Sequence, residues 1–169
     1  MGAENGSARH GERPGHAVER VATFSDGVFA IAITLLVLPL LDADVRDGTV
    51  GRDLLDLTPN FFAFALSFAV IGRLWRVHHR AFARVVRVDG ALVALSLVFL
   101  FWVALLPFPT AVLGEHGDTT AGVVLYATCT VATAFSSLLL WWYAAFGRSR
   151  LRRGARPLVR SDADPADLR

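Results

Sequence analysis

Charge is missing from most of this chain. Of its 169 residues, 54% are apolar and 19% are charged, and the charged residues gather in short segments between long uncharged runs. Soluble domains contain roughly 45–50% apolar residues, and their helices carry a polar face. The pattern therefore excludes an ordinary soluble domain and predicts a polytopic membrane protein with short loops.

Cysteine and the common catalytic motifs are also scarce or missing. Cys129 is the one cysteine and lies in an apolar run, so no intramolecular disulfide is possible and we expect a small buried side chain. There is no glycine-rich phosphate loop, nucleophile elbow or metal-spaced cysteine set. His78 and His79 are adjacent, about 100° apart on a helix, which is poor geometry for holding one metal. We expect no catalytic residues, no metal site, no cofactor and no enzyme activity.

What the chain does contain is four runs long enough to cross a bilayer, which takes about 20 mostly apolar residues. They cover about 18–41, 54–76, 91–114 and 119–147. The second has a short uncharged core, with Arg73 and Arg76 placed to snorkel. The alternative is that this second run is a buried helix of a soluble protein. The last two runs have no polar face, which a soluble helix needs, so this alternative is disfavoured. The sequence predicts an all-α membrane bundle of four helices over 18–147, between a disordered N-terminal tail, 1–17, and a basic then acidic tail, 148–169.

The connecting segments alternate in charge. The segment after the first run is net acidic, as is the short one after the third, whereas "RLWRVHHRAFARVVR" has five arginines and no acid. The segment after the fourth run is also basic. The positive-inside rule predicts that both termini are cytoplasmic, in a multi-pass protein of the cell membrane. Arginines beside spans are an orientation signal and contact anionic lipid, so we expect membrane lipid and no nucleic acid as a partner.

The first run combines an apolar stripe with a few polar groups. At about 100° per residue from Ile31, Leu35 falls near 40° and Leu38 near 340°. Thr34 lies beside this stripe near 300°, whereas Asp26 falls near 220° and Ser25 near 120°. A carboxylate avoids lipid, so Asp26 should point into protein. The stripe is compatible with lipid, another helix or a water-filled axis, and its periodicity does not choose among them.

Three motifs resemble one known family. "RVATFSDG", with Arg20 followed by Phe24, Ser25 and Asp26, resembles the RxxxFSD signature of the transmembrane protein 175 family of potassium channels. "WRVHHRAF", 75–82, resembles the Trp-x-x-His-His end of that family's second helix, and "ALLPFPTAVLGEH", 104–116, the Pro-Phe-Pro-Thr end of its third. The resemblance covers about 18–146 in order, with four spans where the family's repeat has six.

The resemblance implies a homo-oligomer, a tetramer in bacterial members, whose first helices surround a pore for the potassium ion. Ile31 then stands at the family's hydrophobic constriction, and Leu35, Leu38 and Thr34 continue the pore-lining face. The remaining motif residues are implied to hold the helices together at the cytoplasmic end, away from the pore: Arg20, Phe24, Ser25, Asp26, Trp75, His78 and His79. An imidazole or the indole of Trp75 is the expected partner of Ser25 or Asp26.

Two function classes follow. The first is a potassium-permeable channel with a hydrophobic constriction formed by the first helix of several subunits. The second is a non-conducting membrane scaffold or partner subunit built from the same bundle. Transport of protons or small solutes ranks below both, because it needs ionisable groups near the membrane midplane and Asp26 lies near one end of its span.

Overall fold

The computed structural model describes residues 14–42, 48–85 and 88–146. The predicted tails, 1–17 and 148–169, lie outside the described residues, except that a helix already begins at Pro14. The helices are α1 (Pro14–Leu35), α2 (Leu38–Leu41), α3 (Val50–Asp56), α4 (Thr58–Phe82), α5 (Gly90–Leu105), α6 (Pro107–His116) and α7 (Thr120–Phe146).

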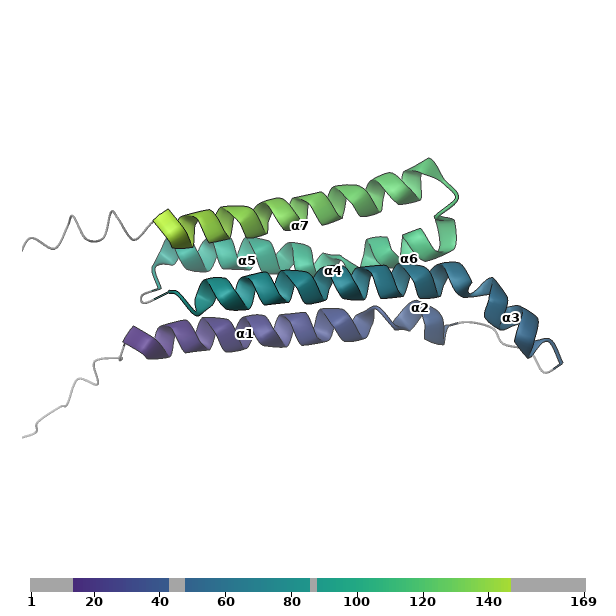
Figure 1. The fold of residues 1–169 in the computed structure, drawn as a ribbon, viewed down its shortest axis with the longest axis horizontal. Coiled ribbons are helices and arrows are strands. Elements are labelled where there is room, and N and C mark those ends of the chain that lie inside the picture. The colour runs from purple at the N-terminus through teal and green to yellow at the C-terminus, as the bar shows by residue number, and fades with distance from the viewer. Residues whose placement is uncertain (1–13, 43–47, 86–87, 147–169) are drawn as a thin grey trace, which may run out of the picture.

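The described residues form an elongated bundle without strands (Figure 1). Four candidate spans run up and down along it: Val18–Leu41, Thr58–Phe82, Gly90–His116 and Thr120–Phe146. The beginning of α1 and the end of α7 lie at the same end of the bundle, at the left of Figure 1. The predicted all-α class with four membrane-spanning helices is confirmed.

The first span is not one continuous helix. It turns at Leu36 and Val37, between α1 and α2. Pro39 explains the break, because proline has no N–H and its ring clashes with the carbonyl four residues earlier, here that of Leu35. The Val37 amide instead reaches the Thr34 carbonyl at 3.4 Å. The angular position derived for Leu38 assumed an unbroken helix, so that projection holds only as far as Leu35.

The second span lies later in the chain than the sequence indicated. Residues 50–56 form the separate short helix α3, and α4 runs from Thr58 to Phe82 instead of over 54–76. Pro59 sits in the first turn of α4, a position where its missing N–H costs nothing and its fixed φ favours a helix start. Arg73 and Arg76 consequently lie inside the span and not at its end.

Proline also divides the third span. α5 ends at Leu105 and α6 begins at Pro107, so the predicted run 91–114 is two helices in line. At the other end, Asp89 caps α5, and its side chain accepts a hydrogen bond from the Leu92 amide at 2.8 Å. This N-cap satisfies one of the amides that a helix start leaves without an intrahelical partner.

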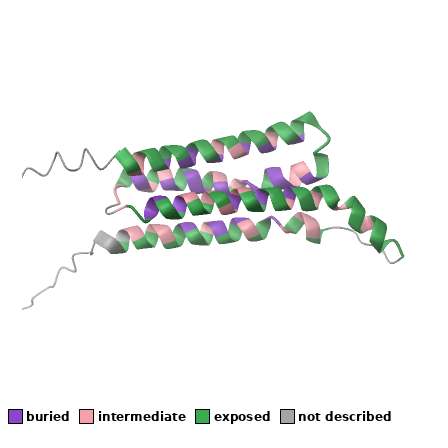
Figure 2. Cartoon of the chain, viewed as in Figure 1, coloured by how far each residue is buried: buried purple, intermediate pink, exposed green. Residues whose placement is uncertain are grey.

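The core lies where α1, α4, α5 and α7 face one another, and Figure 2 shows the buried residues on these inward faces. Phe29 of α1, Ile71 of α4 and Phe99 of α5 are among its most completely buried side chains. The outward faces are largely apolar as well, as a bundle surrounded by lipid requires.

A buried polar chain ties three helices together nearer the other end. The Thr110 hydroxyl donates to the Ser67 hydroxyl at 2.7 Å, and Ser67 donates to the Tyr126 hydroxyl at 3.1 Å. All three side chains are buried. Hydrogen bonds between spans are worth about 0.6–2 kcal/mol each, so this chain helps to fix how α4, α6 and α7 pack.

Candidate pore helix and motif residues

Helix α1 has one face in the bundle and one outside it. Ser25, Phe29, Ala32 and Leu36 recur at spacings of three and four residues and are all buried. Ile31 is on the other side and is 62% exposed, and Leu35 and Leu38 are also exposed. A helix with this spacing buries one stripe and leaves the opposite one to a different environment.

The outer face of α1 differs chemically from that of α5. Every exposed residue of α5 is apolar or glycine, including Leu97, Val98 and Phe101. The exposed residues of α1 include five with charge or a hydroxyl group: Glu19, Arg20, Thr23, Asp26 and Thr34. The Thr34 hydroxyl donates to the Ile31 carbonyl of its own helix at 2.8 Å. Such groups avoid lipid, so the outer face of α1 suits contact with protein or water.

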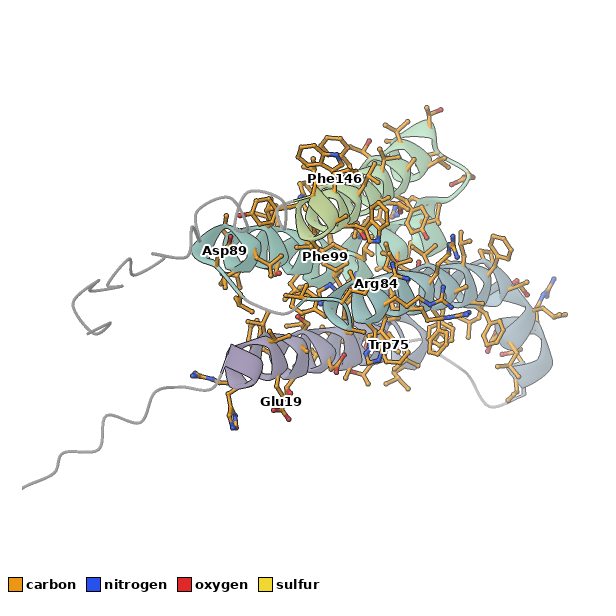
Figure 3. The ribbon with its side chains drawn as sticks, turned by 60° about the vertical axis from the view of Figure 1, so that its left-hand side comes forward. Glu19, Trp75, Arg84, Asp89, Phe99 and Phe146 are labelled. Atoms are coloured by element: carbon orange, nitrogen blue, oxygen red, sulfur yellow. The ribbon has the colours of Figure 1, made fainter. Side chains whose placement is uncertain are left out.

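Asp26 is joined to the second span. Of the partners that the sequence left open, the structure has the indole of Trp75, whose Nε1 donates to Asp26 Oδ1 at 2.8 Å. The His79 ring lies against Trp75, with the ring centroids 5.5 Å apart. Figure 3 shows Trp75 on the side of α4 that faces α1. These three residues form one cluster between α1 and α4.

Ser25 and His78 lie in the apolar core instead. The Ser25 hydroxyl donates to the Val21 carbonyl of its own helix at 2.8 Å, and its side chain is fully buried. The His78 ring stacks on Phe99 at 5.3 Å between centroids and also contacts Phe82 at 4.5 Å. Within the described residues, neither nitrogen of His78 has a hydrogen-bond partner. His78 therefore packs as an aromatic ring here and bonds neither Ser25 nor Asp26.

Arg20 and Phe24 are on a third side. They line a shallow groove between α1 and the beginning of α5, and Phe24 is largely exposed. The other lining residues are Val21, Val88, Val93, Ser96, Leu97 and Leu100. The seven motif residues are thus divided among three places in the single chain.

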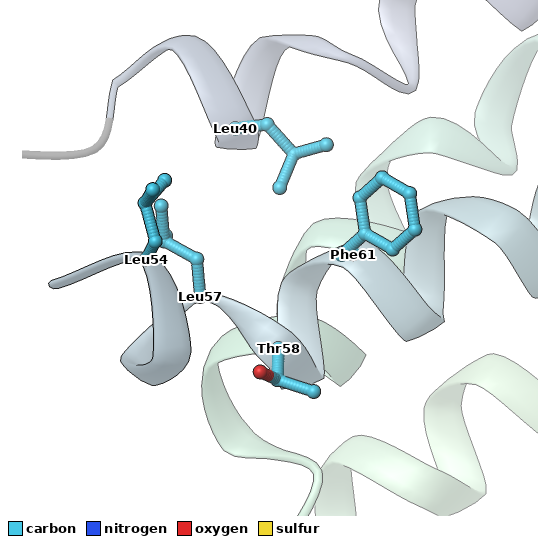
Figure 4. A pocket seen from close by; sticks show the side chains of 5 residues that line it. All are labelled: Leu40, Leu54, Leu57, Thr58 and Phe61. Carbon is cyan, nitrogen blue, oxygen red and sulfur yellow. The ribbon is translucent and has the colours of Figure 1, made fainter. Parts of the chain in front are cut away.

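A second apolar groove lies at the opposite end, between α2, α3 and the start of α4 (Figure 4). Leu40 faces Leu54, Leu57 and Phe61 across it, with Thr58 at its floor. None of the residues proposed from the sequence lines this groove.

Asp89 and Tyr143 form a pair that no pattern in the sequence indicates. Besides capping α5, Asp89 accepts a hydrogen bond from the Tyr143 hydroxyl of α7 at 2.6 Å. This bond, and next the one from the Leu92 amide, lower the pKa of Asp89 from its ordinary value of 3.8. An acidic residue directly before an apolar run signals a helix N-cap, but nothing in the sequence pairs it with Tyr143.

The chain is similar to a family of channel proteins over much of its length. The family model described as "Endosomal/lysosomal potassium channel TMEM175" matches residues 20–107. A Streptomyces collinus protein named as a potassium channel is 44% identical over 130 residues, which cover 73% of this chain and 63% of that protein. Another so named, from Chamaesiphon minutus, is 42% identical over 132 residues, covering 75% and 65%. The chain spans less than two thirds of the length of these relatives.

Two further comparisons extend the likeness. The human protein named "Endosomal/lysosomal proton channel TMEM175" is 40% identical over 94 residues, which cover 48% of this chain and 19% of that protein. Among solved structures, the chain is similar to "a lysosomal potassium-selective channel TMEM175 homolog from Chamaesiphon Minutus". The TM-score is 0.69 at 37% identity, and the match covers 82% of this chain and 77% of that one.

Proposed function

Because this chain belongs to the TMEM175 family, we propose that it forms a potassium-permeable channel as a homo-oligomer. In this proposal the outer face of α1 from each copy surrounds a common axis. The relatives named as potassium channels support the permeant ion. Closed rotational symmetry is the usual arrangement of identical subunits, and it would bring the same residues of every copy together at the axis.

The observation that carries this proposal is the mixed outer face of α1. Every span of a single membrane bundle exposes apolar side chains. The exposure of Ile31 alone therefore does not show whether it faces a pore or lipid. α1 combines that side chain with exposed charged and hydroxyl groups, whereas α5 exposes none. The exposed hydroxyls of Thr23 and Thr34 fall within about 80° of Ile31 around the helix, so a water-lined axis accounts for both kinds of residue on that side.

The proposed constriction is a ring of Ile31 side chains, with Leu35 and Leu38 continuing it. Aliphatic rings offer no carbonyl oxygens to replace the hydration shell of an ion, so they gate by narrow fit or by dewetting. Thr34 adds a hydroxyl beside the constriction. We expect modest selectivity among cations as a result.

The motif residues are proposed to hold the helices in place and not to contact the ion. The bond from Trp75 to Asp26 ties α4 to α1. Buried Ser25 and His78 allow α1 to approach the core closely. The arginine-rich end of the bundle is proposed to be cytoplasmic, which places both termini inside.

Ion flux into liposomes tests the channel proposal. The purified protein is reconstituted as wild type, as Ile31→Asn and as Val131→Asn. Val131 is a matched control, because it is a β-branched apolar residue in the middle of α7 and is 67% exposed, against 62% for Ile31. We expect potassium flux in the wild type, higher flux with weaker preference over sodium in Ile31→Asn, and wild-type behaviour in Val131→Asn.

Other results would redirect the assignment. Equal effects of Ile31→Asn and Val131→Asn on flux would show that Ile31 does not line the axis. Proton flux without potassium flux, followed with a pH-sensitive dye, would favour the activity in the names of the animal relatives. No flux from protein shown to be folded and oligomeric would favour the scaffold alternative.

A further inference from the structure

A row of arginines runs along the outer side of α4. Arg73, Arg76 and Arg80 are spaced by three and four residues, so they fall within about 60° of one another around the helix. All three are exposed, and Arg84 follows them where the helix ends. Figure 3 labels Arg84 at this end of α4. We call Arg73, Arg76 and Arg80 the arginine stripe.

The stripe extends below the membrane surface. Arg73 lies nine residues before Phe82, the last residue of α4, or roughly 14 Å along the helix. The 25 residues of α4 span roughly 38 Å, against about 30 Å of hydrocarbon, so each end can project by only a few ångströms. Arg73 therefore lies well inside the apolar layer. A guanidinium group at that depth extends toward the interface along its apolar stem and is stabilised there by an anion.

The described part of the chain does not supply that anion. Among residues 14–42, 48–85 and 88–146, the one pair of acidic and basic side chains in contact is Glu115 and His116, at 3.9 Å and away from the stripe. Among the described residues, the carboxylates at the arginine-rich end are Glu19, Asp26 and Asp89. Asp26 already accepts from Trp75, and Asp89 from Tyr143 and the Leu92 amide. The described residues of a second copy would add the same three carboxylates and also more arginines, so the excess of positive charge at this end would remain.

We propose that the arginine stripe binds the phosphate headgroups of anionic lipids. A guanidinium group pairs with phosphate through two parallel hydrogen bonds, and an anionic leaflet supplies these phosphates beside the helix. Trp75 lies about 200° around α4 from Arg73, on the side that bonds Asp26 of α1, so it leaves the arginine stripe uncovered.

Thermal unfolding of the full chain in detergent tests this site without measuring conduction. Melting midpoints are recorded while phosphatidylglycerol or phosphatidylcholine is titrated into the micelles. We expect phosphatidylglycerol to raise the wild-type midpoint at much lower concentration than phosphatidylcholine. The variant Arg73→Gln/Arg76→Gln/Arg80→Gln should lose this preference, with a half-saturating phosphatidylglycerol concentration raised about fivefold per charge, or roughly a hundredfold.

The matched control keeps the charge. Arg73→Lys/Arg76→Lys/Arg80→Lys should retain most of the preference, since lysine also attracts phosphate. If the glutamine variant does not fold, the salt dependence of the wild type decides: the preference for phosphatidylglycerol should weaken between low and high salt.

Four results would overturn the proposal. The first two concern the wild type: an equal rise of the melting midpoint with both lipids, or a preference for phosphatidylglycerol that does not change with salt. The other two are an unchanged lipid preference in the glutamine variant and an equal rise of the midpoint with soluble inorganic phosphate. A glutamine variant that changes oligomer size by light scattering but keeps its lipid preference would identify the stripe as a contact between copies.

Discussion

Trp75 donates a hydrogen bond to Asp26 across 49 residues of sequence, and this 2.8 Å contact links the two spans that begin the bundle. The carboxylate is partly open to its surroundings, so the indole fixes its orientation and does not bury it. A hydrogen bond to a charged group usually stabilises a fold more than one between neutral groups. The contact therefore adds to the core packing that holds α1 and α4 in their relative position.

A double-mutant cycle measures this contact. Trp75→Phe removes the indole N–H but keeps an aromatic ring, and should lower the free energy of unfolding by about 1 kcal/mol, because Asp26 is exposed. In an Asp26→Ala background the same change should have less effect, since the bond is already gone. Melting midpoints in detergent give the four values. Trp102→Phe in both backgrounds is the control, and its effects should add. Additive effects for Trp75 as well would show that the bond contributes nothing.

We expect the folded protein to lose stability in acid as Asp89 becomes protonated. Its pKa is lowered from 3.8 in the folded chain, chiefly by the Tyr143 hydroxyl. The ionised group therefore stabilises the fold above about pH 4, and this contribution is lost as the pH falls through the lowered value. Melting midpoints between pH 6 and pH 3 should fall more steeply for the wild type than for Asp89→Asn.

The asparagine variant is informative because it still caps a helix but does not titrate in this range. Its midpoint should lie below that of the wild type at pH 6 and approach it at pH 3. Parallel curves would show that Asp89 does not couple folding to pH.

Gly114 marks a close approach of α6 to α4. A Cβ placed there would lie 3.1 Å from the Cα, Cγ and Oδ1 of Asn60, which includes backbone that cannot move alone. Gly114→Ala should therefore destabilise the protein by about 1–3 kcal/mol, as overpacking does. The control is Gly72→Ala in α4, where nothing lies within 4 Å of the new Cβ.

The control should move in the opposite direction, since alanine in a helix is favoured over glycine by about 0.5–1 kcal/mol. Melting midpoints of the two variants thus separate a steric effect from helix propensity. A neutral Gly114→Ala would mean that α4 and α6 can separate at this point without loss.

Much of the fold followed from composition. Four long, mostly apolar runs require four helices, because lipid offers no partner for an open backbone group. The exact ends did not follow. The breaks at Leu36 and Val37 and at Leu106 occur before prolines that hydropathy alone ignores, and the second span begins at Thr58 because Pro59 starts that helix well.

The site was predicted in part. The 3.6-residue period placed Ser25 on the face of α1 away from Ile31, and the structure buries Ser25 and exposes Ile31. The same period did not identify the neighbours. Asp26 meets Trp75, while His78, three residues on, turns into the core against Phe99. Three residues along a helix shift a side chain by only about 60° around it, and here that shift separates the side of α4 that meets α1 from the side that meets α5.

The sequence by itself determined that the chain is a helical membrane bundle, which residues of α1 share a face, and which family it resembles. These properties follow from local periodicity and from the cost of placing polar groups in lipid. The tertiary structure decided which polar groups meet, as with Asp89 and Tyr143, and which stay on the surface, as with the arginine stripe. Such pairings depend on the rotation and height of whole helices against one another, and packing of the complete core sets both.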